Sequence, residues 1–143
     1  KLENETILTE EFKKNPPSLE AFKSNVKEII KISKENNIQV IFLTQPSVFS
    51  DDEYWKDKEA PIFWLKEQKY HISGKTKYEL LNTFNSELLK ICNETNTYCF
   101  DLASEIPNSF DYFYDDVHFN DKGSVLVGKT VAKYFITIYK KNK

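Results

Sequence analysis

The chain has 143 residues, about the length of one average domain, and is 40% hydrophobic and 29% charged. This balance supplies enough apolar material for a core and excludes collagen, disulfide scaffolds and long disorder. The formal net charge of −2 gives no overall attraction to nucleic acid or anionic lipid. No apolar run approaches the roughly 18 residues of a membrane span, and no signal-peptide pattern is visible. We therefore expect a single domain over residues 1–143, without a nucleic-acid partner or membrane span and with its oligomeric state open.

Two residue types are missing from the chain. It has no Met, so position 1 is not an initiator, and we expect the chain to be part of something longer. All 20 basic residues are Lys, so the bidentate recognition of phosphate or carboxylate that arginine provides is excluded.

A first helix is predicted from Ser18 to Asn36. Pro16 and Pro17 precede it, and Ser18 can cap its first turn. Asn36 and Asn37 favour its end, because Asn tolerates the left-handed conformation found there. Apolar residues at helical spacing define its buried face: Leu19, Phe22, Val26, Ile29 and Ile30.

An unbroken apolar run from Ile38 to Thr44 follows, and it predicts a strand of a parallel sheet that is buried on both faces. Residues 46–76 then show no clear period and are rich in aromatic residues. A connection of this length is typical of a functional loop, so we interpret it as an insertion or lid at the carboxyl end of the strand. Its substrate-binding candidates are Trp55, Phe63 and Trp64.

The second half of the chain repeats the alternation of helix and strand. A helix is predicted over residues 78–93, a strand over 98–102, and a last helix over 121–139, which Asn120 caps. Gly128 indicates either a close approach of the last helix to the sheet or a tolerated glycine. The predicted buried face of this helix is Gly128, Val131, Ala132, Phe135 and Ile138.

This order of elements favours a parallel α/β architecture. Two strands alone would not bury both faces of residues 38–44, so we expect further strands on the N-terminal side that are missing from this chain. Cys92 and Cys99 fit neither a zinc site nor a Cys-x-x-Cys motif. They are either two small buried hydrophobic residues or a local disulfide across a helix-to-strand turn, with reactive thiol chemistry as a third possibility.

The two histidines differ in their surroundings. His71 precedes Ser73-Gly74-Lys75-Thr76, which is not a phosphate loop, because the first glycine of that motif would have to stand at Lys69. We interpret His71 as a residue of an exposed loop, with a substrate-facing lid as the alternative. His118 comes three residues after Asp115, between the second strand and the last helix. In a tight turn this spacing lets the carboxylate bond imidazole Nδ1–H, which leaves Nε2 free as a base. The alternative is that both aspartates stabilise a turn and His118 is incidental.

The block Asp115-x-x-His118-Phe-Asn-x-x-Gly123, after a parallel strand that ends in Thr44-Gln45-Pro46, resembles the C-terminal part of SGNH/GDSL hydrolases. The resemblance covers the chain from about Ser18. It implies a three-layer α/β/α fold of flavodoxin-like type and a Ser-His-Asp triad in which Asp115 orients His118, the general base.

The resemblance also implies what this chain lacks. The family's Gly-Asp-Ser nucleophile block, its Gly block and its Gly-x-Asn-Asp block are absent, and no serine here stands in a nucleophile motif. Because these blocks normally precede the segments present here, the nucleophile and the oxyanion hole are expected outside this chain. We therefore expect a serine esterase or acylhydrolase without a cofactor or metal, acting on a small-molecule or carbohydrate ester, with a cell-envelope or secreted location favoured.

Two other readings stay open. A metal-dependent hydrolase could use an oxygen-rich cluster with one nitrogen ligand: Asp111, Asp115, Asp116, His118 and Asp121. A non-enzymatic carbohydrate-binding domain could use Trp55, Trp64 and their neighbours as stacking platforms, although aromatic residues in a loop often form only a small satellite core.

Overall fold

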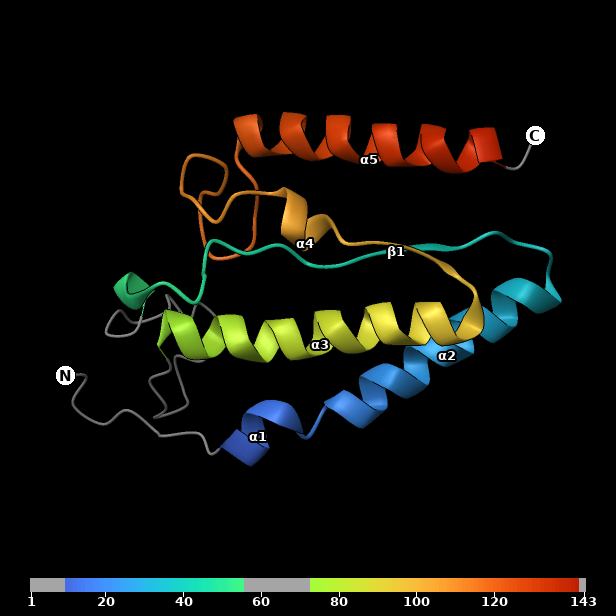
Figure 1. Cartoon of the computed structure of the whole chain (residues 1–143), viewed down its shortest axis with the longest axis horizontal. Coiled ribbons are helices and arrows are strands. Elements are labelled where there is room, and N and C mark those ends of the chain that lie inside the picture. Colours follow the sequence, from blue (N-terminus) through green and yellow to red (C-terminus); the bar gives the residue numbers. More distant parts are fainter. Residues whose placement is uncertain (1–9, 56–72, 142–143) are drawn as a thin grey trace.

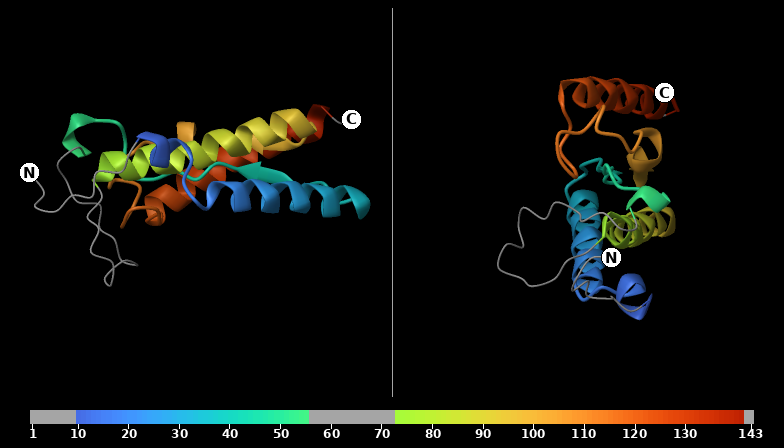
Figure 2. Two further views of the ribbon diagram at one scale, coloured as in Figure 1. Left: turned by 90° about the horizontal axis from the view of Figure 1, so that it is seen from below. Right: turned by 90° about the vertical axis from the view of Figure 1, so that its left-hand side faces the viewer.

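The computed structural model describes residues 10–55 and 73–141, which form a mixed α/β domain around a small parallel sheet (Figure 1). Helix α5 lies on one side of the sheet, and helices α2 and α3 lie on the other (Figures 1 and 2). The mixed helix-and-strand class predicted from the sequence is confirmed. Its described elements are α1 (Glu10–Lys14), α2 (Leu19–Glu35), β1 (Ile41–Leu43), the 3₁₀ helix η1 (Glu53–Trp55), α3 (Gly74–Thr95), β2 (Tyr98–Phe100), α4 (Leu102–Glu105) and α5 (Asp121–Lys141).

The two strands pair in parallel, with Ile41 opposite Tyr98 and Leu43 opposite Phe100. Both are shorter than predicted, and the prediction of two buried faces is wrong for the first strand. Ile38 is 62% exposed and Leu43 is exposed, because in the described part of the chain β1 pairs only with β2. The other edge of β1 has no neighbouring strand among those residues.

Helix α2 follows its prediction except at its cap and at Ile29. Leu19 is buried, and Val26 and Ile30 are buried against α3. The prediction that Ile29 is buried is wrong, since it is 46% exposed. The predicted Ser18 cap is wrong: Ser18 itself has helical backbone angles, and its side chain makes no capping hydrogen bond. The amide of Leu19, the first helical residue, is satisfied separately, by the carbonyl of Pro16.

The end of α2 and both ends of α3 depend on short polar residues. Asn37 and Asn96 adopt left-handed backbone angles after α2 and α3, as Asn tolerates. Helix α3 begins at Gly74, before the predicted residue 78, because the Ser73 hydroxyl accepts a hydrogen bond from the Thr76 amide. The sequence that ends in Gly-Lys-Thr is therefore a helix cap.

A disulfide joins Cys92 near the end of α3 to Cys99 in β2, which settles the alternatives left open by the sequence. It fastens the helix to the strand that follows it. Cys92 is also buried with Val26, Ile30, Leu88 and Ile91 in a core between α2 and α3. A second core, at the carboxyl end of the strands, contains Val48, Phe49, Trp55, Leu102, Ile106 and Phe113.

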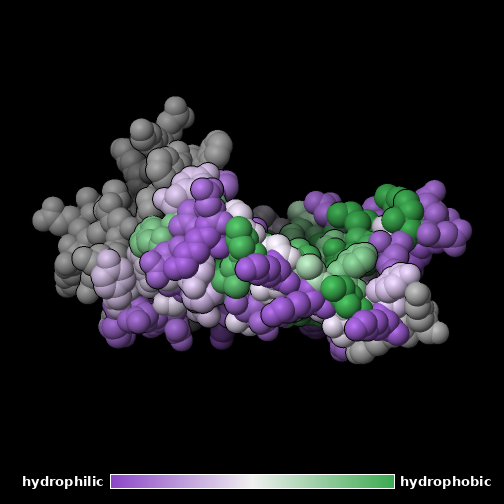
Figure 3. All heavy atoms as spheres, turned by 90° about the horizontal axis from the view of Figure 1, so that it is seen from above, coloured by the Kyte–Doolittle hydropathy of each residue, from purple (hydrophilic) through white to green (hydrophobic). Residues whose placement is uncertain are grey.

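Helix α5 is held to the sheet at few points. Tyr134 stacks on Phe100 with ring centroids 4.3 Å apart, and Ile138 is buried. Val131 is partly buried and packs against the second core, as predicted. The prediction is wrong for Gly128, Ala132 and Phe135, which are exposed: Phe135 is 56% exposed, and a Cβ added at Gly128 would meet no atom within 4 Å. The close approach proposed for Gly128 therefore does not occur in the described structure. Figure 3 shows apolar side chains at the surface toward the end of the molecule where α5 ends.

Candidate active site

The segment between α4 and α5 folds into a tight hairpin-like turn. Phe113 and Phe119 form an antiparallel bridge, and the amide of Tyr114 bonds the carbonyl of His118 at 3.1 Å. Inside the turn, Asp115 Oδ1 accepts hydrogen bonds from the amides of Val117 (3.0 Å) and His118 (2.8 Å). An aspartate that bonds amides two and three residues later stabilises a turn by itself. The backbone thus fixes where Asp115 and His118 lie.

The same turn brings the two side chains together. Asp115 Oδ2 lies 2.7 Å from His118 Nδ1, so the predicted contact between them, through Nδ1, is confirmed. In this arrangement Nδ1–H donates to the carboxylate, and Nε2 is the ring nitrogen left for chemistry. The His118 side chain is 57% exposed, and Nε2 bonds none of the described residues. The histidine is therefore oriented on one side and open on the other.

The pKa of Asp115 lies below its ordinary value of 3.8. Partial burial raises this pKa, but the donors that face the carboxylate outweigh that effect. These donors are the backbone amides of His118 and Val117 and the His118 ring. Hydrogen bonds to the ionised form favour it, so Asp115 is a carboxylate at neutral pH and accepts a hydrogen bond from imidazole Nδ1–H.

Asp116 anchors the turn to the rest of the domain. Its carbonyl accepts a hydrogen bond from the amide of Val48 at 3.0 Å, in the segment that follows β1. Its carboxylate forms an ion pair with Lys77 in the first turns of α3. The dyad of Asp115 and His118 therefore lies on the carboxyl-end side of the sheet, where open α/β sheets bind ligands.

The remaining residues of the motif build the start of α5. Asn120 Oδ1 accepts a hydrogen bond from the Gly123 amide at 2.9 Å, so the predicted Asn120 cap is confirmed. A Cβ added at Gly123 would lie 2.0 Å from the Tyr112 carbonyl oxygen. Only glycine allows this approach without a shift of the backbone.

The acidic residues considered for a metal site do not gather around one point. Asp116 pairs with Lys77, and Asp111 lies 3.8 Å from Lys122. Within residues 10–55 and 73–141, no three His, Cys, Asp or Glu side chains are placed to hold a metal ion. Among the described residues, Asp115 and His118 are the only two members of this cluster that contact each other directly.

The aromatic candidates fall into two groups. Phe63 and Trp64 lie outside the described residues, as does His71, so their predicted roles stay predictions. Trp55 is 8% exposed and packs edge-on against Phe49, as in the packing alternative for this loop. One edge of Trp55 still lines an open cavity of about 460 Å³ together with Tyr54 and Phe110.

Sequence reasoning missed two partners of the site. Tyr114 stacks on the His118 ring, with centroids 5.7 Å apart and planes 12° apart. The sequence could have indicated this contact, because a hairpin-like turn centred between Tyr114 and His118 brings residues four positions apart side by side. Lys77 pairs with Asp116 across 39 positions of sequence, and no local pattern indicates that contact.

Comparison with family models, with curated proteins and with solved structures gives no match for this chain. None of the helices among the described residues is long and apolar enough to cross a membrane.

Proposed function

We propose that this chain supplies the general base and the orienting carboxylate of a serine esterase or acylhydrolase of the SGNH type. The observation that carries the proposal is the 2.7 Å contact of Asp115 with His118 Nδ1, together with an exposed Nε2. A carboxylate that holds one imidazole nitrogen and leaves the other open is the arrangement that general-base catalysis needs.

In this mechanism a serine hydroxyl attacks the carbonyl carbon of an ester. His118 Nε2 takes the hydroxyl proton as the Ser–C bond forms, and Asp115 stabilises the resulting imidazolium. The proton then passes to the alkoxide as the ester C–O bond breaks. Water, deprotonated by the same Nε2, then attacks the acyl carbon, and Nε2 returns the proton to the serine oxygen as the bond between that oxygen and the acyl group breaks. Neither Asp115 nor His118 is consumed.

The serine of this proposal lies outside residues 1–143. Among the described residues, no Ser, Thr or Cys side chain bonds the His118 ring. The unpaired edge of β1 offers a place for the missing structure. The helices on the two sides of the sheet both carry exposed apolar side chains: Ile29 and Ile32 on α2, and Phe135 and Ile136 on α5.

A parallel strand paired with this edge would cover those apolar side chains, as parallel sheets are covered on both faces. A helix that leads into a parallel strand normally starts from a neighbouring parallel strand. Helix α2 leads into β1 in this way. We therefore propose that residues 10–141 are the C-terminal part of a three-layer α/β/α sheet of flavodoxin-like type, completed by strands that also carry the nucleophile.

The cavity beside Trp55 supports a proposal for the class of acyl group that the enzyme would accept. The cavity beside Trp55 combines the exposed rings of Tyr54 and Phe110 with the carboxylates of Asp52 and Asp111. This mixture favours a polar or carbohydrate-borne acyl group over a long lipid, with Trp55, Phe63 and Trp64 as binding residues. The same cavity supports the second candidate, a carbohydrate-binding α/β domain without catalysis, because exposed rings stack on sugars in either case.

The Cys92–Cys99 disulfide supports a cell-envelope or secreted location, since disulfides persist in oxidising compartments.

The test is an esterase assay with p-nitrophenyl acetate on residues 1–143 and on a longer polypeptide that contains them. We expect background hydrolysis from residues 1–143 and serine-dependent hydrolysis from the longer polypeptide, lost with His118→Ala. The matched control is Lys122→Ala, an exposed residue near the site with no proposed role in the reaction. Activity of residues 1–143 that disappears when one of their own serines is changed would contradict the proposal.

A further inference from the structure

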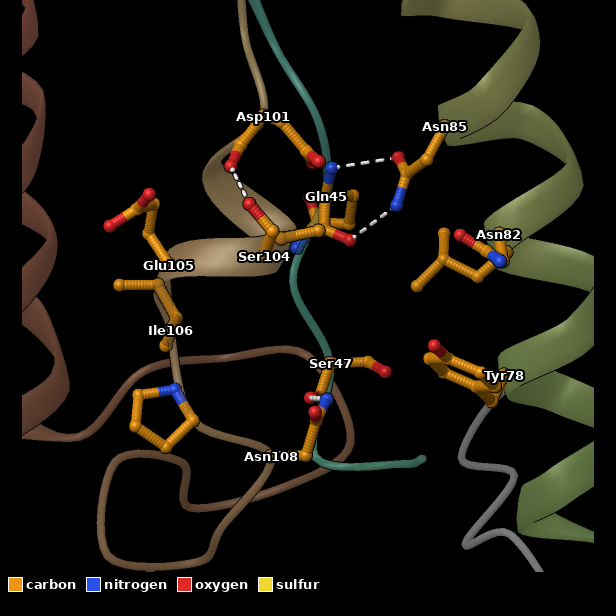
Figure 4. Close-up of a pocket in the computed structure, with 13 residues that line it drawn as sticks. Gln45, Ser47, Tyr78, Asn82, Asn85, Asp101, Ser104, Glu105, Ile106 and Asn108 are labelled. Atoms are coloured by element: carbon orange, nitrogen blue, oxygen red, sulfur yellow. Dashed lines mark hydrogen bonds between the residues drawn. The ribbon is translucent and has the colours of Figure 1, made fainter. Parts of the chain in front are cut away.

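We propose that a cavity at the carboxyl ends of β1 and β2 binds a neutral polyhydroxylated ligand such as a monosaccharide. The cavity has a volume of about 320 Å³ and lies between α3 and the segments that follow the two strands (Figure 4). Ligand pockets in proteins span roughly 300–1,000 Å³, so the size suits a single small ligand. The inference goes beyond the proposed hydrolase, because it uses neither Asp115 nor His118.

The frame of this cavity is fixed by side chains that bond the backbone. Asn85 of α3 accepts a hydrogen bond from the amide of Gln45 and donates one to its carbonyl, each at 2.9 Å. Across the cavity, the Thr44 hydroxyl donates to Asp101 Oδ1 at 2.7 Å and accepts from the amide of Ala103 at 2.8 Å. These hydrogen bonds fix the positions of the segments that form the walls, so the cavity is formed before a ligand binds.

Two other polar side chains on the same walls, Tyr78 and Asn82, have no such structural task. They are spaced by four positions on α3, and Asn85 follows Asn82 by three, so all three share one face of the helix. In Figure 4 they point from α3 toward the segment that follows β1. The Tyr78 hydroxyl and the Asn82 amide bond none of the other described residues. One phenol and one amide are therefore left to donate to and accept from a ligand.

The charge of the lining selects among ligand classes. Asp101 and Glu105 line the cavity, and among residues 10–55 and 73–141 no lysine does. Two carboxylates without a facing cation disfavour an anion such as a phosphate or a carboxylate ligand. Leu81, Ile106 and Pro107 add apolar surface to the lining. A ligand that offers hydroxyls on its rim and C–H groups on its faces satisfies both kinds of surface, and a neutral sugar has this form.

The test is a titration of the ¹⁵N-labelled protein with D-glucose, N-acetylglucosamine and D-glucuronate, followed through the side-chain amide signals of Gln45, Asn82 and Asn85. We expect saturable shifts with one of the neutral sugars and weaker binding of glucuronate. Asn82→Leu and Tyr78→Phe should each weaken the binding of the neutral sugar about tenfold. Asn93→Leu is the matched control, because Asn93 is exposed on α3 and does not line the cavity.

Three results would overturn the proposal: no saturable shift with either neutral sugar at millimolar concentration, binding unchanged in both Asn82→Leu and Tyr78→Phe, or glucuronate bound as tightly as the neutral sugars. Circular dichroism of each variant separates lost binding from lost folding. The readout needs no ester hydrolysis, so failure here leaves the esterase proposal standing, and failure of the esterase assay leaves this one standing.

Discussion

The turn that carries Asp115 and His118 and the outer side of β1 have opposite kinds of structure. In the turn, neighbouring residues supply nearly every contact: Asp115 bonds the two amides that follow it and the His118 ring. By contrast, several apolar side chains of α2 and α5 lie exposed, and among the described residues β1 pairs with β2 alone. A turn can therefore be fixed by its own residues while the burial of a helix face depends on distant partners.

The two parts of the proposed catalytic site differ in how much structure they require. The proton-handling part of the proposed triad requires only a short turn with the right spacing, and the turn of Asp115 and His118 has that geometry. A nucleophile at about 3 Å from Nε2 requires a further element. Substitutions in the Asp115–His118 turn should therefore affect activity and stability differently from substitutions on the exposed helix faces.

His118→Ala should reduce esterase turnover of the longer polypeptide by orders of magnitude, because the serine loses its base. Asp115→Asn should cost about 10⁴-fold, since an amide lets the imidazole hold the wrong tautomer. Steady-state kinetics with p-nitrophenyl acetate measure both. A decrease below tenfold in either variant, with folding intact, would mean that the turn is structural.

Phe113→Ala should destabilise residues 1–143 by about 4 kcal/mol, because Phe113 is fully buried at the base of the turn. Phe135→Ala, at an exposed position of α5, should change the free energy of unfolding by less than about 0.5 kcal/mol. Urea unfolding of both variants gives the comparison. In the longer polypeptide the cost of Phe135→Ala should rise, because a paired strand would bury that ring. An equal cost with and without the additional structure would argue against docking at this face.

Gly123→Ala should cost about 3 kcal/mol, because its methyl group would clash with the Tyr112 carbonyl oxygen. Gly128→Ala lies on the same helix and is the matched control. Its methyl group meets open space, so the better helix propensity of alanine should stabilise the chain by about 1 kcal/mol. Thermal unfolding compares the pair. If Gly123→Ala also stabilised the chain, the turn would tolerate a shift of its backbone and the expectation would be wrong.

Reduction of the Cys92–Cys99 disulfide should lower the free energy of unfolding by about 2.5 kcal/mol, the loop-closure value for a short loop. The paired variant Cys92→Ser with Cys99→Ser should unfold like the reduced protein. The Asp115–His118 turn should keep its NMR signals, because the disulfide fastens α3 to β2 and not to the turn. Loss of those signals on reduction would show that the two regions are coupled.

The smallest expected effect is the acid dependence of the turn. The folded-state pKa of Asp115 lies below 3.8, so the ionised carboxylate stabilises the folded state at neutral pH. This contribution is complete above the unfolded pKa and is lost as the pH falls through the folded pKa. The stability difference between the native chain and Asp115→Asn should therefore narrow as the pH falls below 3.8. A difference that grows in acid would contradict the low pKa.

Local patterns in the sequence predicted much of this structure. Apolar spacing located the three long helices, and the Asn residues at 37 and 96 marked two helix ends through their left-handed angles. The three-residue spacing of Asp115 and His118 predicted their contact, because an aspartate can close such a turn without help from distant residues.

What the sequence could not predict depends on distant partners. The apolar stripe of α5 reads as a buried face, yet it is mostly exposed, because burial depends on what packs opposite and not on the stripe itself. The pairing of Lys77 with Asp116 joins two segments that only the fold brings together. The Ser18 cap failed for a local reason, since the residue after Pro16 and Pro17 takes helical backbone angles and not the extended angles typical of a capping residue.

The most direct test of the central claim is labelling of the longer polypeptide with a fluorophosphonate, which reacts with activated serines, followed by mass spectrometry of the modified peptide. The account predicts one labelled serine outside residues 1–143, with labelling abolished in His118→Ala and retained in Lys122→Ala. Labelling of a serine within residues 1–143, or labelling that persists in His118→Ala, would contradict it.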